Sequence, residues 1–356
     1  MTSRRSQDER ALLLPLEAAD DLPPLPRHLT PMQPRLAAAA FNSEDYLFEV
    51  KWDGVRALVA RDASGLRITD RHGGDLLGQL PELARAARQL PEGTLLDAEL
   101  VACDARGRPR YELLAARLGP ARRKSGRGPL LLAFDLLYES YRPLMDRPLR
   151  ERRERLARLV VAGAPLLVPE HLESDGEPFL EAVREFALEG VVAKRRDSAY
   201  VPGARAADWL KVHAAPRMDV VVCGVIQRDG APHRLVCGAH RDRALVNVGR
   251  AYVPPFLRNY VTRELAGLER DDSPLAGPVV LADGLRWVAP RRCAIVEHSG
   301  ECSTTLTEDA RFRSFRMDLG PEDCVVEEAL HVPSGEPRLD RDRPRLVVLR
   351  SLFPHD

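Results

Sequence analysis

The order of apolar and polar positions in the first 216 residues predicts β-strands separated by turns, with a few helices. Residues 47–60 form a long strand-like run, and the glycine pair at 73–74 marks a later turn. Residues 81–90 begin with proline and carry apolar residues on one face, which predicts a short helix. The same patterns predict strands at 66–69, 94–102, 130–138, 191–194 and 209–213, and helices at 149–160 and 178–188.

The pattern changes after Pro216, where short β runs separated by turns follow one another. Five such runs in about 115 residues are typical of a small closed barrel of the oligonucleotide-binding (OB) type. The five runs are residues 218–226, 234–240, 244–250, 285–289 and 293–298.

Together these elements predict an α+β protein with two domains. The first is expected to contain antiparallel sheets with flanking helices, and the second a β-barrel. A length of 356 residues is sufficient for two separate cores. We expect an irregular N-terminal arm, the two domains and a C-terminal tail, with bounds at 1–27, 28–216, 217–332 and 333–356.

Composition and charge are those of a soluble globular protein, with 44% hydrophobic and 30% charged residues and a formal net charge of zero. Zero net charge argues against a protein that is held on nucleic acid by bulk charge alone. There is no apolar run of about 18 residues and no signal-peptide core, so we expect a cytoplasmic protein without a membrane span. The six scattered cysteines are expected to be buried free thiols.

Lysine is rare in this chain, which has 53 lysines and arginines together but lysine only at positions 51, 124, 194 and 211. Arginine cannot lose its proton in a protein, whereas a lysine amine can be made neutral and nucleophilic by burial or by nearby cations. Lys51, Lys194 and Lys211 each close an apolar, strand-like run, which is not the polar loop setting of an ordinary surface lysine. These three lysines are therefore candidates for a chemical role.

Lys51 begins the sequence Lys-Trp-Asp-Gly-Val-Arg, which has the form Lys-x-Asp-Gly-x-Arg. This form is the signature of the covalent nucleotidyltransferases, and six further segments resemble, in order, those of the ATP-dependent DNA ligases. They are Thr30-Pro-Met, Asp70-Arg-His-Gly, Leu96-Asp-Ala-Glu-Leu, Ala133-Phe-Asp-Leu-Leu-Tyr, Glu189-Gly-Val-Val-Ala-Lys and Trp209-Leu-Lys. The chain most resembles bacterial ligases of the end-joining type, which are compact catalytic cores with an OB-fold domain.

The resemblance implies that the first domain is an adenylation (nucleotidyltransferase) domain with Lys51 as its nucleophile. The amine would attack the α-phosphorus of ATP and release pyrophosphate. The resulting lysyl-AMP would pass its AMP to the 5′-phosphate of a nick, and the 3′-hydroxyl would then displace AMP and seal the strand. Arg56, Lys194 and Lys211 would lower the pKa of Lys51 by like-charge repulsion and would stabilise charge on the phosphate.

The resemblance also assigns roles around the nucleotide. Glu49 would read the adenine amino group and Phe134 would stack on the base, while Arg56 and Arg71 resemble ribose and phosphate contacts. Taken alone, Phe134 in an apolar strand would be an ordinary core residue. Its functional interpretation depends on the order of the motifs around it.

Three carboxylates complete the implied site. Glu99 and Glu189 resemble the residues that serve the ribose and a divalent metal ion, either Mg²⁺ or Mn²⁺, because hard oxygen ligands suit such ions. Asp53 has the spacing from Lys51 at which the family uses an acid near the reacting 3′ end.

Two departures from the family pattern affect the first chemical step. His213 replaces the second cation of a Lys-x-Lys element, so phosphate support there is expected to depend on pH. The final motif usually reads Arg-x-Pro-x-Phe followed by further cations that orient pyrophosphate, but residues 311–316 read Arg-Phe-Arg-Ser-Phe-Arg. Arg313 or Arg316 is a candidate to fill this role, and self-adenylation is expected to suffer more than sealing.

The implied substrate is nicked duplex DNA, held through its phosphates without sequence preference. The implied protein is a monomer in the nucleoid, with a Ku-like end-binding protein or a repair polymerase as candidate partner. Two alternatives stay open: an RNA ligase or capping-type enzyme, and a degenerate ligase that binds DNA without catalysis. The order of the motifs favours DNA, and the intact set of Lys51, Asp53 and Arg56 argues against a non-catalytic module.

Overall fold

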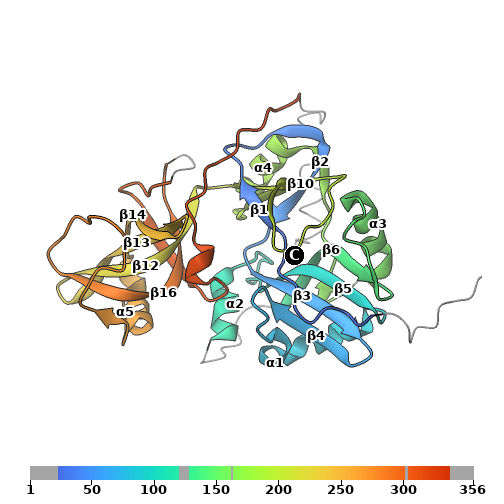
Figure 1. The fold of residues 1–356 in the computed structure, drawn as a ribbon, viewed down its shortest axis with the longest axis horizontal. Helices are drawn as coiled ribbons and strands as arrows, with labels where there is room; N and C mark the ends of the chain where they lie inside the picture. Colours follow the sequence, from blue (N-terminus) through green and yellow to red (C-terminus); the bar gives the residue numbers. More distant parts are fainter. Residues whose placement is uncertain (1–22, 120–127, 162, 301–303, 337–356) are drawn as a thin grey trace, which may run out of the picture.

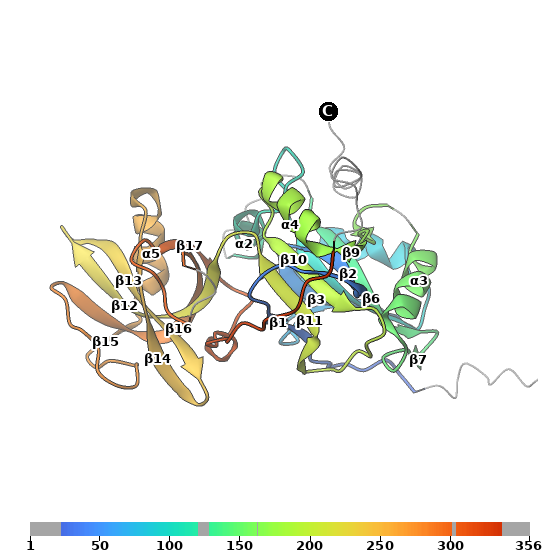
Figure 2. The ribbon, with the colours of Figure 1, turned by 90° about the horizontal axis from the view of Figure 1, so that it is seen from above.

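The computed structural model of the chain describes residues 23–119, 128–161, 163–300 and 304–336. Two lobes lie side by side (Figure 1), and the view from above separates them in the same way (Figure 2). The larger lobe contains two β-sheets with helices, and the smaller lobe contains a third sheet. The basic run at 122–124, most of the N-terminal arm and the chain beyond residue 336 lie outside the described residues.

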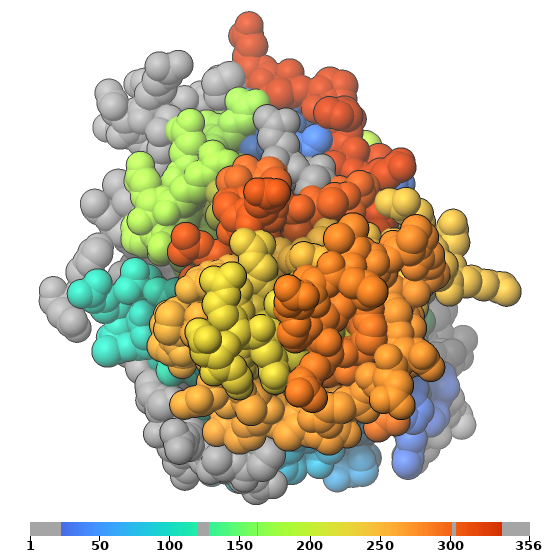
Figure 3. Space-filling view, turned by 90° about the vertical axis from the view of Figure 1, so that its left-hand side faces the viewer, coloured from blue at the N-terminus to red at the C-terminus, as the bar shows by residue number. Residues whose placement is uncertain are grey.

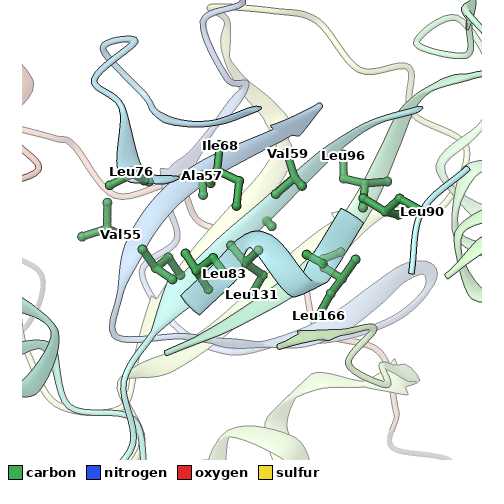
Figure 4. Packing of buried hydrophobic residues seen from close by; sticks show 14 of the residues in the cluster. Val55, Ala57, Val59, Ile68, Leu76, Leu83, Leu90, Leu96, Leu131 and Leu166 are labelled. Carbon is green, nitrogen blue, oxygen red and sulfur yellow. The ribbon is translucent and has the colours of Figure 1, made fainter. Parts of the chain in front are cut away.

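The first sheet of the larger lobe is antiparallel at its centre and carries an apolar core on one face. Its strands have the order β4-β3-β5-β6-β7, with β8 beside β6. Val55, Ile68, Leu83 and Leu96 are among the buried residues of this core (Figure 4). The elements are β3 (Val55–Asp62), β4 (Gly65–Asp70), β5 (Thr94–Val101), β6 (Leu130–Glu139), β7 (Arg142–Pro143), β8 (Leu166–Leu167), α1 (Leu76–Gln79), the 3-10 helix η2 (Pro81–Arg88), α2 (Tyr111–Leu118) and α3 (Leu149–Leu159).

The second sheet of the larger lobe has the strand order β1-β11-β10-β2-β9. One helix packs on it, because Phe179 and Val183 join Phe48 and Val50 in one apolar core. The opposite face of this sheet is therefore free to carry polar side chains. The elements are β1 (Gln33–Leu36), β2 (Asn42–Lys51), β9 (Leu172–Asp175), β10 (Gly190–Arg195), β11 (Arg205–His213) and α4 (Gly176–Glu185).

The smaller lobe is a sheet whose strand pairings form a ring. β12 pairs with β13, β13 with β14, β14 with β17, β17 with β16, and β16 with β12. Asp229 and Gly230 both have positive φ and form the two-residue first hairpin loop, as Asp-Gly turns do. The elements are β12 (Arg217–Arg228), β13 (Ala231–Arg241), β14 (Ala244–Tyr252), the 3-10 helix η3 (Pro255–Leu257), α5 (Arg258–Leu265), β15 (Glu269–Arg270), β16 (Leu285–Glu297), β17 (Arg311–Arg316) and the 3-10 helix η4 (Pro321–Asp323).

Most predicted strands and helices are present, but two strand predictions were wrong. The run at 47–60 is two strands, β2 and β3, joined by a turn through Gly54, where a Cβ would lie 2.3 Å from the carbonyl oxygen of Leu100. The runs at 285–289 and 293–298 are one strand, β16, because Pro290 falls at a register irregularity where no ladder hydrogen bond is needed. The pattern did not predict several of the elements, which are β1, β7, β8, β9, β15, β17, α1 and α5.

A segment after the barrel strands returns to the larger lobe, and we call residues 324–335 the C-terminal strap. At its start, Val326 N–H donates to the His240 carbonyl in β13 at 2.8 Å. Farther along, Leu330 N–H donates to the Leu36 carbonyl in β1 at 2.9 Å, and Ala38 N–H donates to the Leu330 carbonyl at 2.9 Å. Seen from the side of the smaller lobe, this segment runs in red across the top of the molecule (Figure 3).

The expectation from composition that the cysteines are buried free thiols is met within the described ranges. The five cysteines found there are buried and free, and Cys302 lies outside these ranges. Among the same residues, no helix combines the length and apolar character that crossing a membrane requires.

An ion pair in the interior of the larger lobe ties α3 to β6. Arg152 and Asp135 are both fully buried, and the guanidinium donates to the carboxylate at 2.7 and 2.9 Å. The Arg152 guanidinium also donates to the Ser198 carbonyl at 2.9 Å. Removal of either partner would leave a buried charge without compensation.

We therefore predict that Asp135→Ala lowers the free energy of unfolding by about 3–5 kcal/mol, the cost of an unpaired buried charge. Urea denaturation followed by fluorescence and circular dichroism measures this change. Arg155→Ala is a suitable control on the same helix, since its pair with Glu139 is largely exposed and its loss is expected to cost less than about 1 kcal/mol. Equal losses for the two variants would contradict the prediction.

Candidate active site

Three neighbouring strands place candidate residues on one face of the second sheet. Lys51 in β2 lies opposite Gly190 in β10, and Gly190 lies opposite His213 in β11. Two residues farther along these strands, Glu49 in β2 and Lys211 in β11 lie at the same level on either side of β10. Because side chains alternate along a strand, these residues share one face, and the apolar residues between them point into the core beneath α4.

Gly190 allows the strands to approach closely beside Lys51. A Cβ at this position would lie 2.2 Å from the carbonyl oxygen of Val212, so any other residue would push β11 away. Glu189, immediately before it, is buried and accepts a hydrogen bond from the Lys51 amine at 2.5 Å. The predicted nucleophile is thus held by a carboxylate on the neighbouring strand.

A cavity of about 1060 Å³ opens in front of this face. Its walls come from both sheets of the larger lobe, from the smaller lobe and from the C-terminal strap. It is the place where the sequence-predicted residues meet, and those that line it are Glu49, Lys51, Arg56, Arg71, Glu99, Phe134, Glu189, Lys194, Lys211, His213 and Arg316. Asp53 is the predicted site residue that is not part of the lining.

The deep end of the cavity is aromatic and contains a buried ion pair. Lys194 donates to Glu49 at 2.6 Å, and its amine lies 4.0 Å from the centre of the Phe134 ring and 4.3 Å from that of Trp209. Burial would raise the pKa of Glu49, but Lys194 and then Arg153 outweigh it and hold the pKa low. Lys194 therefore interacts with Glu49 and the two rings, and not with the Lys51 amine as expected.

Arg56 forms part of the same wall. Its guanidinium donates twice to the buried Asp97, at 2.5 Å in each case, and lies 4.6 Å from the centre of the Phe134 ring. The Tyr200 hydroxyl donates to the same carboxylate at 2.7 Å. This arrangement fixes Arg56 against the aromatic end, where a base and a ribose could be held.

Buried carboxylates surround the Lys51 amine. Burial raises the pKa of Glu99 to about 8, with Arg56 and Lys51 acting against it. Burial, followed by the negative charge of Glu189, raises the pKa of Asp53 to about 6. One oxygen of Asp53 and one of Glu189 are buried without a hydrogen-bond partner. Buried oxygen donors of this kind fit a hard divalent cation such as Mg²⁺.

His213 is neutral at physiological pH, which corrects the expectation of a partly charged side chain. Burial first, and then the charges of Lys51 and Lys211, hold its pKa well below the usual range. Its Nδ1 lies 4.0 Å from Glu189. A pH-dependent charge at this position is therefore not available to the phosphate.

The arginines of the final motif are engaged elsewhere. Arg316 donates to Asp318 at 2.7 and 2.8 Å and to the Gly54 carbonyl at 3.2 Å, and lies 4.0 Å from Asp53. Arg313 is 45% exposed and lies 3.3 Å from Glu297 in the barrel. Arg316 therefore joins the barrel to the turn after Lys51, while Arg313 is held within the barrel.

Several side chains that shape the site were not assigned from the sequence. Asp97 could have been recognised, because it alternates with Glu99 within an apolar strand and an interior carboxylate needs a cation. Arg153, Arg205 and Glu327 gave no such signal, since the chain is rich in arginine and glutamate. Only the fold brings Arg205 and Glu327 to the cavity and Arg153 to within 3.7 Å of Glu49.

Comparison with known proteins supports the resemblance. The family model of the ATP dependent DNA ligase domain matches residues 29–213, more than half of the chain. The multifunctional non-homologous end joining protein LigD of Mycolicibacterium smegmatis is 31% identical over 305 residues, which cover 82% of this chain and 38% of that protein. LigD of Pseudomonas aeruginosa is 29% identical over 89% of this chain and 38% of its own length.

A solved structure of mycobacterial DNA ligase D, complexed with ATP and MES, is also similar. It is 32% identical, has a TM-score of 0.58, and the match covers 84% of this chain and 98% of that one. The chain thus spans well under half of the full-length LigD relatives but nearly all of this ligase structure. These matches favour a DNA ligase over the RNA ligase alternative, and the chain belongs to the ATP-dependent DNA ligase family.

Proposed function

We propose that this chain is a DNA ligase that seals nicks through an AMP intermediate on Lys51. The observation that carries the proposal is the position of the Lys51 amine, 2.5 Å from Glu189 and at the wall of a large cavity with an aromatic end. The cavity is large enough for a nucleotide, since small-molecule sites commonly measure about 300–1000 Å³. ATP is the cofactor that the family implies.

The side chains support specific roles in this reaction. The adenine would lie against Phe134, next to Glu49, whose second oxygen has no hydrogen-bond partner and can accept from the base amino group. Lys194 would then orient Glu49 and not act on the phosphate. Arg56, held by Asp97, would contact the ribose, and Arg71 would contact phosphate.

The nucleophilic step requires a neutral amine at Lys51. Glu189 is placed to accept the proton, since it already accepts a hydrogen bond from this amine. The amine would form a bond to the α-phosphorus as the bond from that phosphorus to the bridging oxygen breaks. Pyrophosphate would leave with the electron pair, and AMP would remain on Lys51.

We also propose that Glu99 and Glu189 hold a divalent cation, Mg²⁺ or Mn²⁺. When bound, it would neutralise charge on the phosphate oxygens. The raised pKa of Glu99 supports this role, because a cation would restore the ionised carboxylate that burial disfavours.

The smaller lobe fits an OB-fold domain, and we propose domains at 28–216 and 217–332. The ring of strand pairings and the helix between the third and fourth barrel strands support this assignment. Such a domain would grip nicked duplex DNA through its phosphates. The names of the LigD relatives support a role in end joining, with a Ku-like protein or a repair polymerase as partner.

Incubation with ATP and magnesium is expected to add the mass of one AMP to the wild-type protein. Lys51→Ala should gain nothing, because the nucleophile is absent. Lys51→Arg is the sharper control, since it keeps the cation beside Glu189 but cannot be deprotonated. Intact-protein mass spectrometry measures the adduct, and an adduct of equal yield on either variant would contradict the proposal.

Sealing must be measured separately, with nicked duplexes that carry a 5′-adenylate. A DNA ligase seals these without ATP, and faster than matched duplexes with RNA at the nick. Absence of both the adduct and sealing would favour the non-catalytic DNA-binding module. Preference for RNA would favour the RNA ligase alternative.

Asp53 makes a prediction about pH. Its pKa in the folded protein is about 6, above the usual 3.8, so the protonated form is favoured by folding. This contribution to stability is full below about pH 4 and is lost as the pH rises through 6. Asn cannot ionise, so from pH 4 to 7 Asp53→Asn should gain about 2 kcal/mol of stability relative to wild type. Urea denaturation at each pH tests this, and a constant difference would contradict it.

A further inference from the structure

The reaction needs a cation for the departing pyrophosphate, and the two arginines of the final motif are both paired with carboxylates, although Arg316 lines the cavity. In the final motif, Arg316 is held by Asp318 and the Gly54 carbonyl, and Arg313 lies beside Glu297. A leaving group with several negative charges cannot depart efficiently without compensation in a partly buried cavity. The cation must therefore come from another part of the described structure.

Three cations from the larger lobe gather at one side of the cavity. Lys211 and Arg205 contact the same carboxylate, that of Glu327, with the lysine amine at 2.6 Å. Arg71 lies 3.4 Å from the carboxylate of Asp323, just before the strap. All five side chains line the cavity that contains Lys51.

The cations are close enough to influence one another. Burial and then the charge of Arg205 lower the pKa of Lys211 to about 7, and the charge of Lys51 acts in the same direction. Burial and then the charge of Arg71 lower the pKa of Arg205. Because the cations repel one another, binding of an anion among them is favoured. In the protein without nucleotide, carboxylate side chains of the chain itself are the bound anions.

We infer that Arg205 and Lys211 form the binding site for the pyrophosphate of ATP, and that Glu327 of the C-terminal strap occupies this site when no nucleotide is bound. The inference rests on the proposed function and deepens it. Arg205 takes the role that the final motif has lost, and Arg71 extends the site toward Asp323. The carboxylate of Glu327 resembles a phosphate in charge and in its ability to accept from a guanidinium.

The backbone of the strap is anchored on either side of Glu327, so only the Glu327 side chain needs to move away from the cations and back. The backbone hydrogen bonds of Val326 and Leu330 lie on either side of it, to the barrel and to β1 respectively. Binding of ATP would replace the Glu327 carboxylate with the β- and γ-phosphates. After Lys51 has taken AMP, Glu327 would compete with pyrophosphate for the same cations, which favours release of the product and opposes the reverse reaction.

The test uses the full chain and inorganic pyrophosphate as the probe, measured by isothermal titration calorimetry. Glu327→Gln should bind pyrophosphate about tenfold more tightly than wild type, because a competing carboxylate at a charged site is removed. The matched control is Glu336→Gln, an exposed carboxylate just after the strap that does not line the cavity, which should bind as wild type does. Arg205→Ala should weaken binding about tenfold.

A double variant separates competition from a general effect on the fold. If Glu327 acts through Arg205 and Lys211, most of the gain from Glu327→Gln disappears in the Arg205→Ala background. In the adenylation assay, Glu327→Gln should have a lower KM for ATP than wild type, in line with its tighter binding of pyrophosphate.

Failure of this inference is distinguishable from failure of the proposed function. If Glu327→Gln binds pyrophosphate no more tightly than Glu336→Gln, the strap does not occupy the site, whatever the outcome of adenylation. If Arg205→Ala binds as wild type does, Arg205 is not part of the pyrophosphate site. Tighter binding by Glu327→Gln without any AMP adduct on Lys51 would support competition and contradict adenylation of Lys51 by ATP, and sealing of 5′-adenylated nicks would then decide the ligase proposal.

Discussion

The close register of β2, β10 and β11 is the constraint on which the rest of the site depends. Gly190 sits between Lys51 and His213, and the carbonyl of Val212 occupies the space that a side chain would need. Because the three strands are level, their alternate residues form one polar face, and the others bury the core beneath α4. A shift of one residue in β10 would send Glu189 and Lys194 to opposite faces from those they now occupy.

The charges on this face are of two kinds, and their partners distinguish them. Arg56 with Asp97 is a closed pair in which both carboxylate oxygens are hydrogen-bonded, which compensates for removal from water. Glu49, Asp53 and Glu189 each keep an oxygen without a hydrogen-bond partner, and burial raises the pKa of Asp53 and of Glu99. Stability alone does not explain such groups, and a ligand that supplies positive charge does.

The sequence predicted the chemistry of this site better than its geometry. Lys51, Glu49 and Phe134 could be assigned because motif order and the scarcity of lysine single them out. The position of Lys194 could not, because the strand register decides whether it faces the phosphate or the base, and register is a property of the paired sheet. Glu327 is about 140 residues from Glu189 in sequence, and no local pattern indicates that the two line one cavity.

In this chain the cation for pyrophosphate lies in the larger lobe and not in the final motif of the smaller lobe. When the pyrophosphate cation belongs to the barrel, the barrel must close over the nucleotide for the first step and open for DNA. Here Arg205 lies in β11, on the same rigid sheet as Lys211, so the cation is in place without barrel movement. The barrel contributes Arg316, which contacts the Gly54 carbonyl beside Asp53, at the end of the site that would meet the nick. Because the smaller lobe is not needed for adenylation, it can remain adapted to the DNA steps. The strap contacts both lobes and so links the state of the nucleotide site to the position of the smaller lobe.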